Sequence, residues 1–117
     1  MKETSMKLVY QIGKQAVGGG HHFEIGRSVH SGGGVSGYAS ADCGAIDPEY
    51  FNVHGICAPH RVALMVQAEA MHKALLMAQS ALFASHTDAA LAIIREALAD
   101  TREEINAATA AAKGGAA

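Results

Sequence analysis

The chain has 117 residues and a formal net charge of −2, and 17% of its residues are charged, against about 25% in an average domain. This length leaves room for one domain, which we place at residues 1–117. Nine Lys and Arg against eleven Asp and Glu provide no basic stripe for phosphates, so the composition disfavours nucleic-acid binding.

No segment is typical of a membrane span or a secretion signal. The longest apolar segment, residues 62–84, is interrupted by five polar side chains that a bilayer core would penalise: Gln67, Glu69, His72, Lys73 and Gln79. Charged residues also interrupt the apolar stretch at the N-terminus, where a signal peptide would need an apolar core. We therefore expect a cytoplasmic protein with no membrane partner.

The first half of the chain has the pattern of a small sheet. Apolar side chains alternate over residues 6–12 and 23–29, which predicts two short, half-buried strands. Residues 10–17 and 23–30 also look like copies of one another, each followed by a glycine triplet suited to a tight turn. With a weaker run at residues 35–41 as a third strand, the sequence predicts an antiparallel β-meander within residues 1–46.

The second half predicts a helical hairpin over residues 59–110, followed by a disordered tail at 111–117. Pro59 suits the first position of a helix. Residues 85–88 resemble a capping box, and a second helix with one charged face follows. The fold class is therefore α+β. The stripe expected to pack the first helix on other helices at a shallow angle consists of Leu64, Ala68, Met71, Leu75, Ala78 and Leu82.

The first predicted helix carries more apolar surface than one partner helix and a small sheet can cover. Each large apolar side chain left in water forfeits about 1.5 to 3 kcal/mol. A second copy of the chain, giving a dimeric four-helix bundle, is the simplest cover. The alternatives are a monomer with a more extensive sheet and a methionine-rich groove for a second protein. The side chains expected at the interface are Val62, Met65, Val66, Met77 and Phe83.

The hairpin also carries a resemblance to a known family. The pattern Phe51-x-Val53-x-Gly55-Ile56 is followed by Ala63-Leu64, Ala68, Ala78 and a second alanine-rich helix. This pattern resembles the helical hairpin of a family of short bacterial proteins known only as a domain of unknown function. The resemblance covers residues 51–109, and it implies the hairpin but no activity.

Seven histidines are an unusual number for this length. His54, Cys57 and His60 follow one another at intervals of three, and Cys43 could add a fourth ligand to give a zinc-like Cys₂His₂ site. The alternative is two reduced cysteines that act as small apolar side chains. A Cys43–Cys57 disulfide would be unexpected in a reducing cytoplasm. His21-His22 is either a loop site for a transition metal or an exposed hairpin tip.

The glycine triplets also raise the possibility of an anion site. Lys14 and Arg27 occupy equivalent places in the two copies, where they could meet a small anion. Neither triplet continues as a P-loop or a dinucleotide-binding motif. Asp42 precedes Cys43 and would raise the pKa of that thiol, which disfavours a cysteine nucleophile.

These patterns favour a non-catalytic adaptor or regulatory protein that forms homo-oligomers and binds a second protein or a small ligand. We expect no catalytic residue and no cofactor. The alternative function is binding of a zinc-like metal through Cys43, His54, Cys57 and His60. A third is an anionic ligand or an enzymatic activity at the glycine-rich loops.

Overall fold

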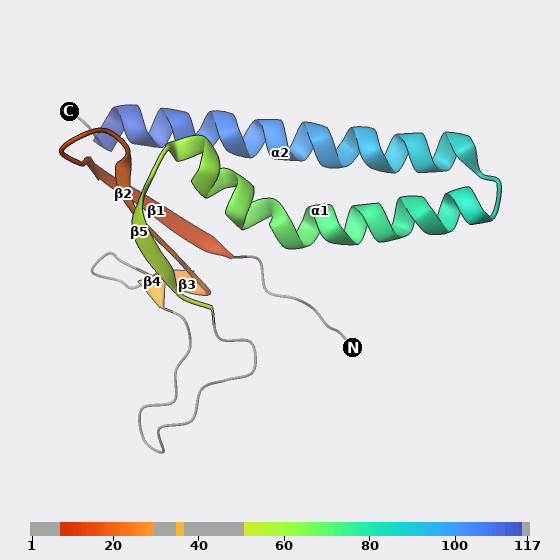
Figure 1. Cartoon of the computed structure of the whole chain (residues 1–117), viewed down its shortest axis with the longest axis horizontal. Coiled ribbons are helices and arrows are strands. Elements are labelled where there is room, and N and C mark those ends of the chain that lie inside the picture. The colour runs from red at the N-terminus through yellow and green to blue at the C-terminus, as the bar shows by residue number, and fades with distance from the viewer. Residues whose placement is uncertain (1–7, 30–34, 37–50, 116–117) are drawn as a thin grey trace, which may run out of the picture.

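The computed structural model describes residues 8–29, 35–36 and 51–115. A small antiparallel sheet precedes two long helices that lie side by side as a hairpin (Figure 1). The α+β class and the helical hairpin predicted from the sequence are therefore confirmed. The second helix continues to Gly115, so the predicted disordered tail is wrong for residues 111–115, and residues 116–117 lie outside the described part of the chain. Neither helix in this part of the chain combines the length and apolarity needed to cross a membrane.

The main sheet has three antiparallel strands in the order β1-β2-β5, namely Val9–Gln15, His21–Gly26 and Val53–Cys57. The first glycine triplet forms the turn between β1 and β2. Its φ angles are 92°, 104° and 77° at Gly18, Gly19 and Gly20, a region that side chains rarely adopt. The predicted role of this triplet is confirmed, whereas the second triplet lies outside the described residues.

The third strand of this sheet is not the predicted run at residues 35–41. Within that run, β4 (Val35–Ser36) pairs instead with β3 (Ser28–Val29) in a separate two-stranded sheet, and residues 37–41 lie outside the described part of the chain. The third position belongs to β5, which immediately precedes the first helix. The sheet therefore takes one strand from beyond residue 46.

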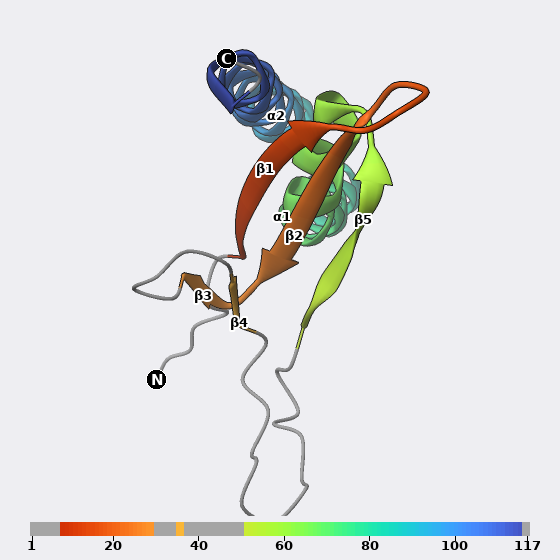
Figure 2. The ribbon, with the colours of Figure 1, turned by 90° about the vertical axis from the view of Figure 1, so that its left-hand side faces the viewer.

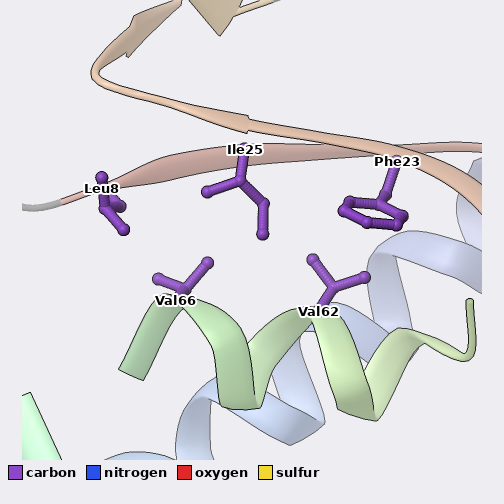
Figure 3. Close-up of a cluster of buried hydrophobic side chains, with 5 residues drawn as sticks. All are labelled: Leu8, Phe23, Ile25, Val62 and Val66. Carbon is purple, nitrogen blue, oxygen red and sulfur yellow. The ribbon is translucent and has the colours of Figure 1, made fainter. Parts of the chain in front are cut away.

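The core lies between the sheet and the first turns of α1 (Pro59–Phe83). Leu8, Phe23 and Ile25 point from the sheet toward Val62 and Val66 of α1 (Figure 3). The view along the helices shows β1 nearer to α2 and β5 farther from it (Figure 2). This arrangement places the core at one end of the hairpin, and the loop that joins the helices lies at the other end (Figure 1).

Small side chains form the seam between α1 and α2 (Thr87–Gly115). The small buried side chains of the two helices are Ala63 and Ala78 on α1 and Ala90, Thr101, Ala108 and Ala112 on α2. On α2 these positions recur at heptad-like intervals, so they share one side of the helix. Because alanine adds little bulk, the two helices pack closely along this seam.

The tight connection between the helices depends on Ser85. Its φ of 65° is left-handed, and its amide donates to the Leu82 carbonyl at 2.9 Å as α1 ends. The His86 carbonyl then accepts from the Ala90 amide at 3.0 Å, which starts α2. Ser85 therefore ends α1. Because α2 begins at Thr87, the N-cap residue is His86, whose side chain is not one of the serine or threonine oxygens that a capping box at residues 85–88 would use.

Replacing Ile25 with alanine should destabilise the protein by about 2 to 5 kcal/mol, because the side chain is 0% exposed and its loss leaves a cavity. Urea unfolding at a fixed protein concentration measures the change. Ile56→Ala is the matched control on the neighbouring strand. It should cost clearly less, because Ile56 is 54% exposed. Equal losses at the two positions would contradict the assignment of the core.

Replacing Ser85 with glycine should stabilise the protein by up to about 1 kcal/mol, because glycine adopts the left-handed conformation without steric cost. Thermal unfolding followed by circular dichroism measures this gain. Ser80→Gly, inside α1, should instead lose about 0.5 kcal/mol, because glycine has a lower helix propensity than serine. Changes of the same sign in the two variants would argue against a left-handed Ser85.

Candidate functional site

The five residues predicted to form an interface fall into buried and exposed groups in the structure. Val62 and Val66 are buried against the sheet, so the prediction that they face a second chain is wrong. Met65 is partly buried against the same core. Met77 and Phe83 are exposed on the part of α1 that extends past the sheet, and they stay candidates for an interface.

One face of the hairpin carries a small groove of about 190 Å³ between the helices. The groove begins at Gln67, beside the contact with the sheet, and continues toward the tip of the hairpin. Its lining combines small and apolar side chains with charged ones. The small and apolar residues are Ala70, Met71, Ala74, Met77, Ile93 and Ala97, and the charged residues are Lys73, Glu96 and Asp100.

Five exposed leucines follow the two helices as regular rows. Leu64, Leu75 and Leu82 are spaced by eleven and seven residues along α1, and Leu91 and Leu98 are seven residues apart on α2. At 3.6 residues per turn, both intervals return a side chain to nearly the same side of its helix. Each helix therefore presents one row of leucines.

The two rows share the face of the hairpin opposite the groove. On α1, the buried Ala78 faces α2. Around the helix axis, Lys73, which lines the groove, lies on one side of Ala78, and Leu75 lies on the other side. On α2, Asp100 lines the groove and Leu98 lies across the seam from it. We call the surface formed by Leu64, Leu75, Leu82, Leu91 and Leu98 the leucine face.

The sequence analysis did not predict the leucine face, although it named three of its five residues. The sequence grouped Leu64, Leu75 and Leu82 with Ala78 in one stripe that packs on other helices. Ala78 is buried in the structure, whereas the three leucines stay exposed. Small side chains occupy the seam instead, as buried Ala78 and Ala90 show. The row of alanines beside the leucines was the available signal, because helices approach most closely where side chains are small.

A polar network fastens the sheet to both helices. The Tyr10 hydroxyl on β1 donates to Glu104 Oε2 on α2 at 2.7 Å. Gln67 Nε2 on α1 donates to Glu104 Oε1 at 3.4 Å. Burial raises the pKa of Tyr10, and the hydrogen bond and negative charge of Glu104 raise it further. The network therefore fixes how the sheet sits on the hairpin.

The structure does not bring together the described members of the predicted Cys₂His₂ site. The register places His54 opposite Glu24 and Cys57 opposite His21. Because side chains alternate along a strand, His54 and Cys57 point to opposite faces of β5. His60 is exposed on the first turn of α1. Cys43, and with it the proposed disulfide, lies outside the described residues.

Cys57 lies on the face of β5 that packs toward the helices and is partly buried against the core. Burial raises the pKa of its thiol, and the nearby positive charge of Arg61 offsets part of this rise. A raised pKa keeps the sulfur protonated and weakly nucleophilic. Cys57 therefore acts as a small apolar residue at the edge of the core.

The two basic residues proposed to meet an anion are separated. Lys14 is exposed near the turn of the β1–β2 hairpin. Arg27 is buried and follows β2 at the opposite end, next to the position where Val9 pairs with Gly26. Because the strands are antiparallel, the length of the hairpin lies between the two side chains. Equivalent places in the two sequence copies therefore do not form one site.

Comparisons with protein families, curated proteins and solved structures find no match to this chain. The resemblance of residues 51–109 to a short bacterial family stays a prediction.

Replacing Tyr10 with phenylalanine should cost about 1 to 3 kcal/mol at pH 8, because Glu104 loses a hydrogen-bond donor in a partly buried setting. The cost should shrink at high pH. The pKa of Tyr10 is higher in the folded chain than its ordinary value near 10, so its contribution is complete below pH 10 and is lost as the pH rises further. Urea unfolding of both proteins at pH 8 and 11 measures the difference. A cost independent of pH would contradict this role.

Proposed function

We propose that this protein is a non-catalytic binding module that forms a homodimer through the leucine face. The observation that carries the proposal is the pair of leucine rows on the side of the hairpin away from the sheet. Leu75 is 64% exposed, and Leu98 is 59% exposed. Burying the open half of such a side chain is worth about 1 kcal/mol.

The size of the leucine face suits another helical hairpin. From Leu64 to Leu82 the α1 row extends about 27 Å at 1.5 Å per residue. Two helices packed about 8 to 10 Å apart make this strip roughly 20 Å wide with their side chains. The resulting area, roughly 500 Å² per chain, approaches the roughly 800 Å² per partner of a standard protein interface.

The occupant that we propose is a second copy of the chain. Leucines seven residues apart on both helices match a partner with the same repeat, and an identical hairpin has it. Two hairpins related by a twofold axis would form a four-helix bundle. Such a dimer would leave both sheets available for a further partner and would present each binding surface twice, which increases avidity.

Replacing Leu75 with glutamate should dissociate the dimer, because a charge would enter the centre of the leucine face. Sedimentation equilibrium at several protein concentrations measures the mass, and circular dichroism checks that the helices persist. Leu76→Glu is the matched control, because Leu76 is adjacent and 53% exposed but points away from this face. The control should stay dimeric. Leu98→Glu tests the same face from α2.

A wild-type protein that is still monomeric at about 100 micromolar would overturn the proposal. This concentration is about ten times a dimer Kd of roughly 10 micromolar, so a dimer of that affinity would be well populated. Dissociation by Leu76→Glu but not by Leu75→Glu would also overturn it and would move the interface to the flank of α1 that carries Phe83.

A further inference from the structure

We propose that the outer face of the sheet binds a divalent transition-metal ion such as Zn²⁺ through His22, Glu24 and His54. This inference is independent of the dimer, since the sheet face and the leucine face belong to different elements. It also differs from the Cys₂His₂ hypothesis, because only His54 belongs to both sets.

The strand register places the three side chains on one surface. Phe23 and Ile25 of β2 point into the core, so His22 and Glu24, which alternate with them, point outward. Glu24 lies directly opposite His54 on β5. The three residues therefore share the face of the sheet that points away from α1.

The spacing on this face is compatible with one ion. Directly opposite residues of an antiparallel pair have Cβ atoms about 4.5 to 5.5 Å apart. His22 and Glu24 are two positions apart on one strand, which separates them by about 6.5 to 7 Å. From such positions, imidazole and carboxylate groups can reach a common point at the roughly 2.0 to 2.2 Å of zinc–ligand bonds.

The surroundings leave space for an ion and its remaining ligands. An open depression of about 510 Å³ is lined by His22, Glu24 and His54, together with Gln11, Gly13 and Ile56 among others. A Cβ at Gly13 would lie 3.9 Å from the Cβ of His22, an ordinary van der Waals contact, so the backbone beside this histidine does not crowd it. The depression opens to solvent, so water or another small ligand could complete the coordination.

The site requires side-chain rotation. Among the described residues, no three His, Cys, Asp or Glu side chains are arranged around a single point. His22 and His54 are exposed and Glu24 is half-buried, so rotation about their side-chain bonds needs no movement of the strands. Two imidazoles and one carboxylate favour borderline metals such as zinc, whereas magnesium and calcium prefer oxygen donors alone.

Titration of the full chain with Zn²⁺, after treatment with a chelator, tests the proposal by isothermal calorimetry and native mass spectrometry. We expect one ion per chain. His22→Gln and His54→Gln should each weaken binding more than about tenfold, since each removes one of three ligands. Binding should also weaken as the pH falls, because protons compete for the imidazole nitrogens.

The controls separate this site from the other histidines and from the cysteines. His72→Gln, at an exposed position on α1, and Cys57→Ser should leave zinc binding unchanged. Amide chemical shifts in the NMR spectrum should change on zinc addition at Glu24 and His54, and not along α2. Absence of saturable binding, or binding that survives His54→Gln, would overturn the proposal. Loss of binding in Cys57→Ser would also overturn it and would restore a cysteine site.

Discussion

The contact between the sheet and the first turns of α1 determines the rest of the structure. Ile25 packs on Val62 and Val66, and this core holds the sheet at one end of the hairpin. Strands of five to seven residues are short beside helices of 25 and 29 residues, which are about 37 and 43 Å long. The distal part of the hairpin therefore extends past its only sheet cover among the described residues (Figure 1).

The helices make two kinds of contact, an alanine contact with each other and a polar network with the sheet, and the two contribute differently to the structure. The alanines between α1 and α2 let the two helices approach closely, but they bury little apolar area. The larger leucines lie outside this contact and stay exposed. The Tyr10–Glu104–Gln67 network adds directional bonds where β1 meets both helices. Such bonds contribute little net stability in general, but they favour one orientation over others because misalignment leaves polar groups unsatisfied. The sheet is thus held in a defined orientation, whereas the leucine face stays open to another helical surface.

Much of the fold could be predicted from local sequence, because periodicity and turn chemistry act over a few residues. The glycine turn at residues 18–20, the two first strands and the helical hairpin follow from such patterns. The third strand could not be found this way, because Gly55 and the nearby histidines hide its alternation and its partner, β2, lies about thirty residues earlier.

The candidate sites depended more strongly on tertiary geometry. Periodicity shows that α1 is apolar on several sides, but not which side meets α2, so the exposed leucines and the buried Ala78 were grouped in one stripe. The intervals of three between His54, Cys57 and His60 suggested a metal cluster. An interval of three suits one face of a helix, but on a strand it sends two side chains to opposite faces. Knowing that residues 53–57 form a strand would have removed Cys57 from the set and pointed to the neighbours of His54.

The junction between β5 and α1 has a mechanical consequence. Only Ala58 separates the end of the strand at Cys57 from the start of the helix at Pro59, and proline restricts the backbone there. A tilt of β5 is therefore transmitted to the base of α1 with little slack. Along a rod of about 37 Å, a tilt of about 5° moves the far end by roughly 3 Å. The direction in which α1 leaves β5 therefore determines where the far end of the hairpin lies.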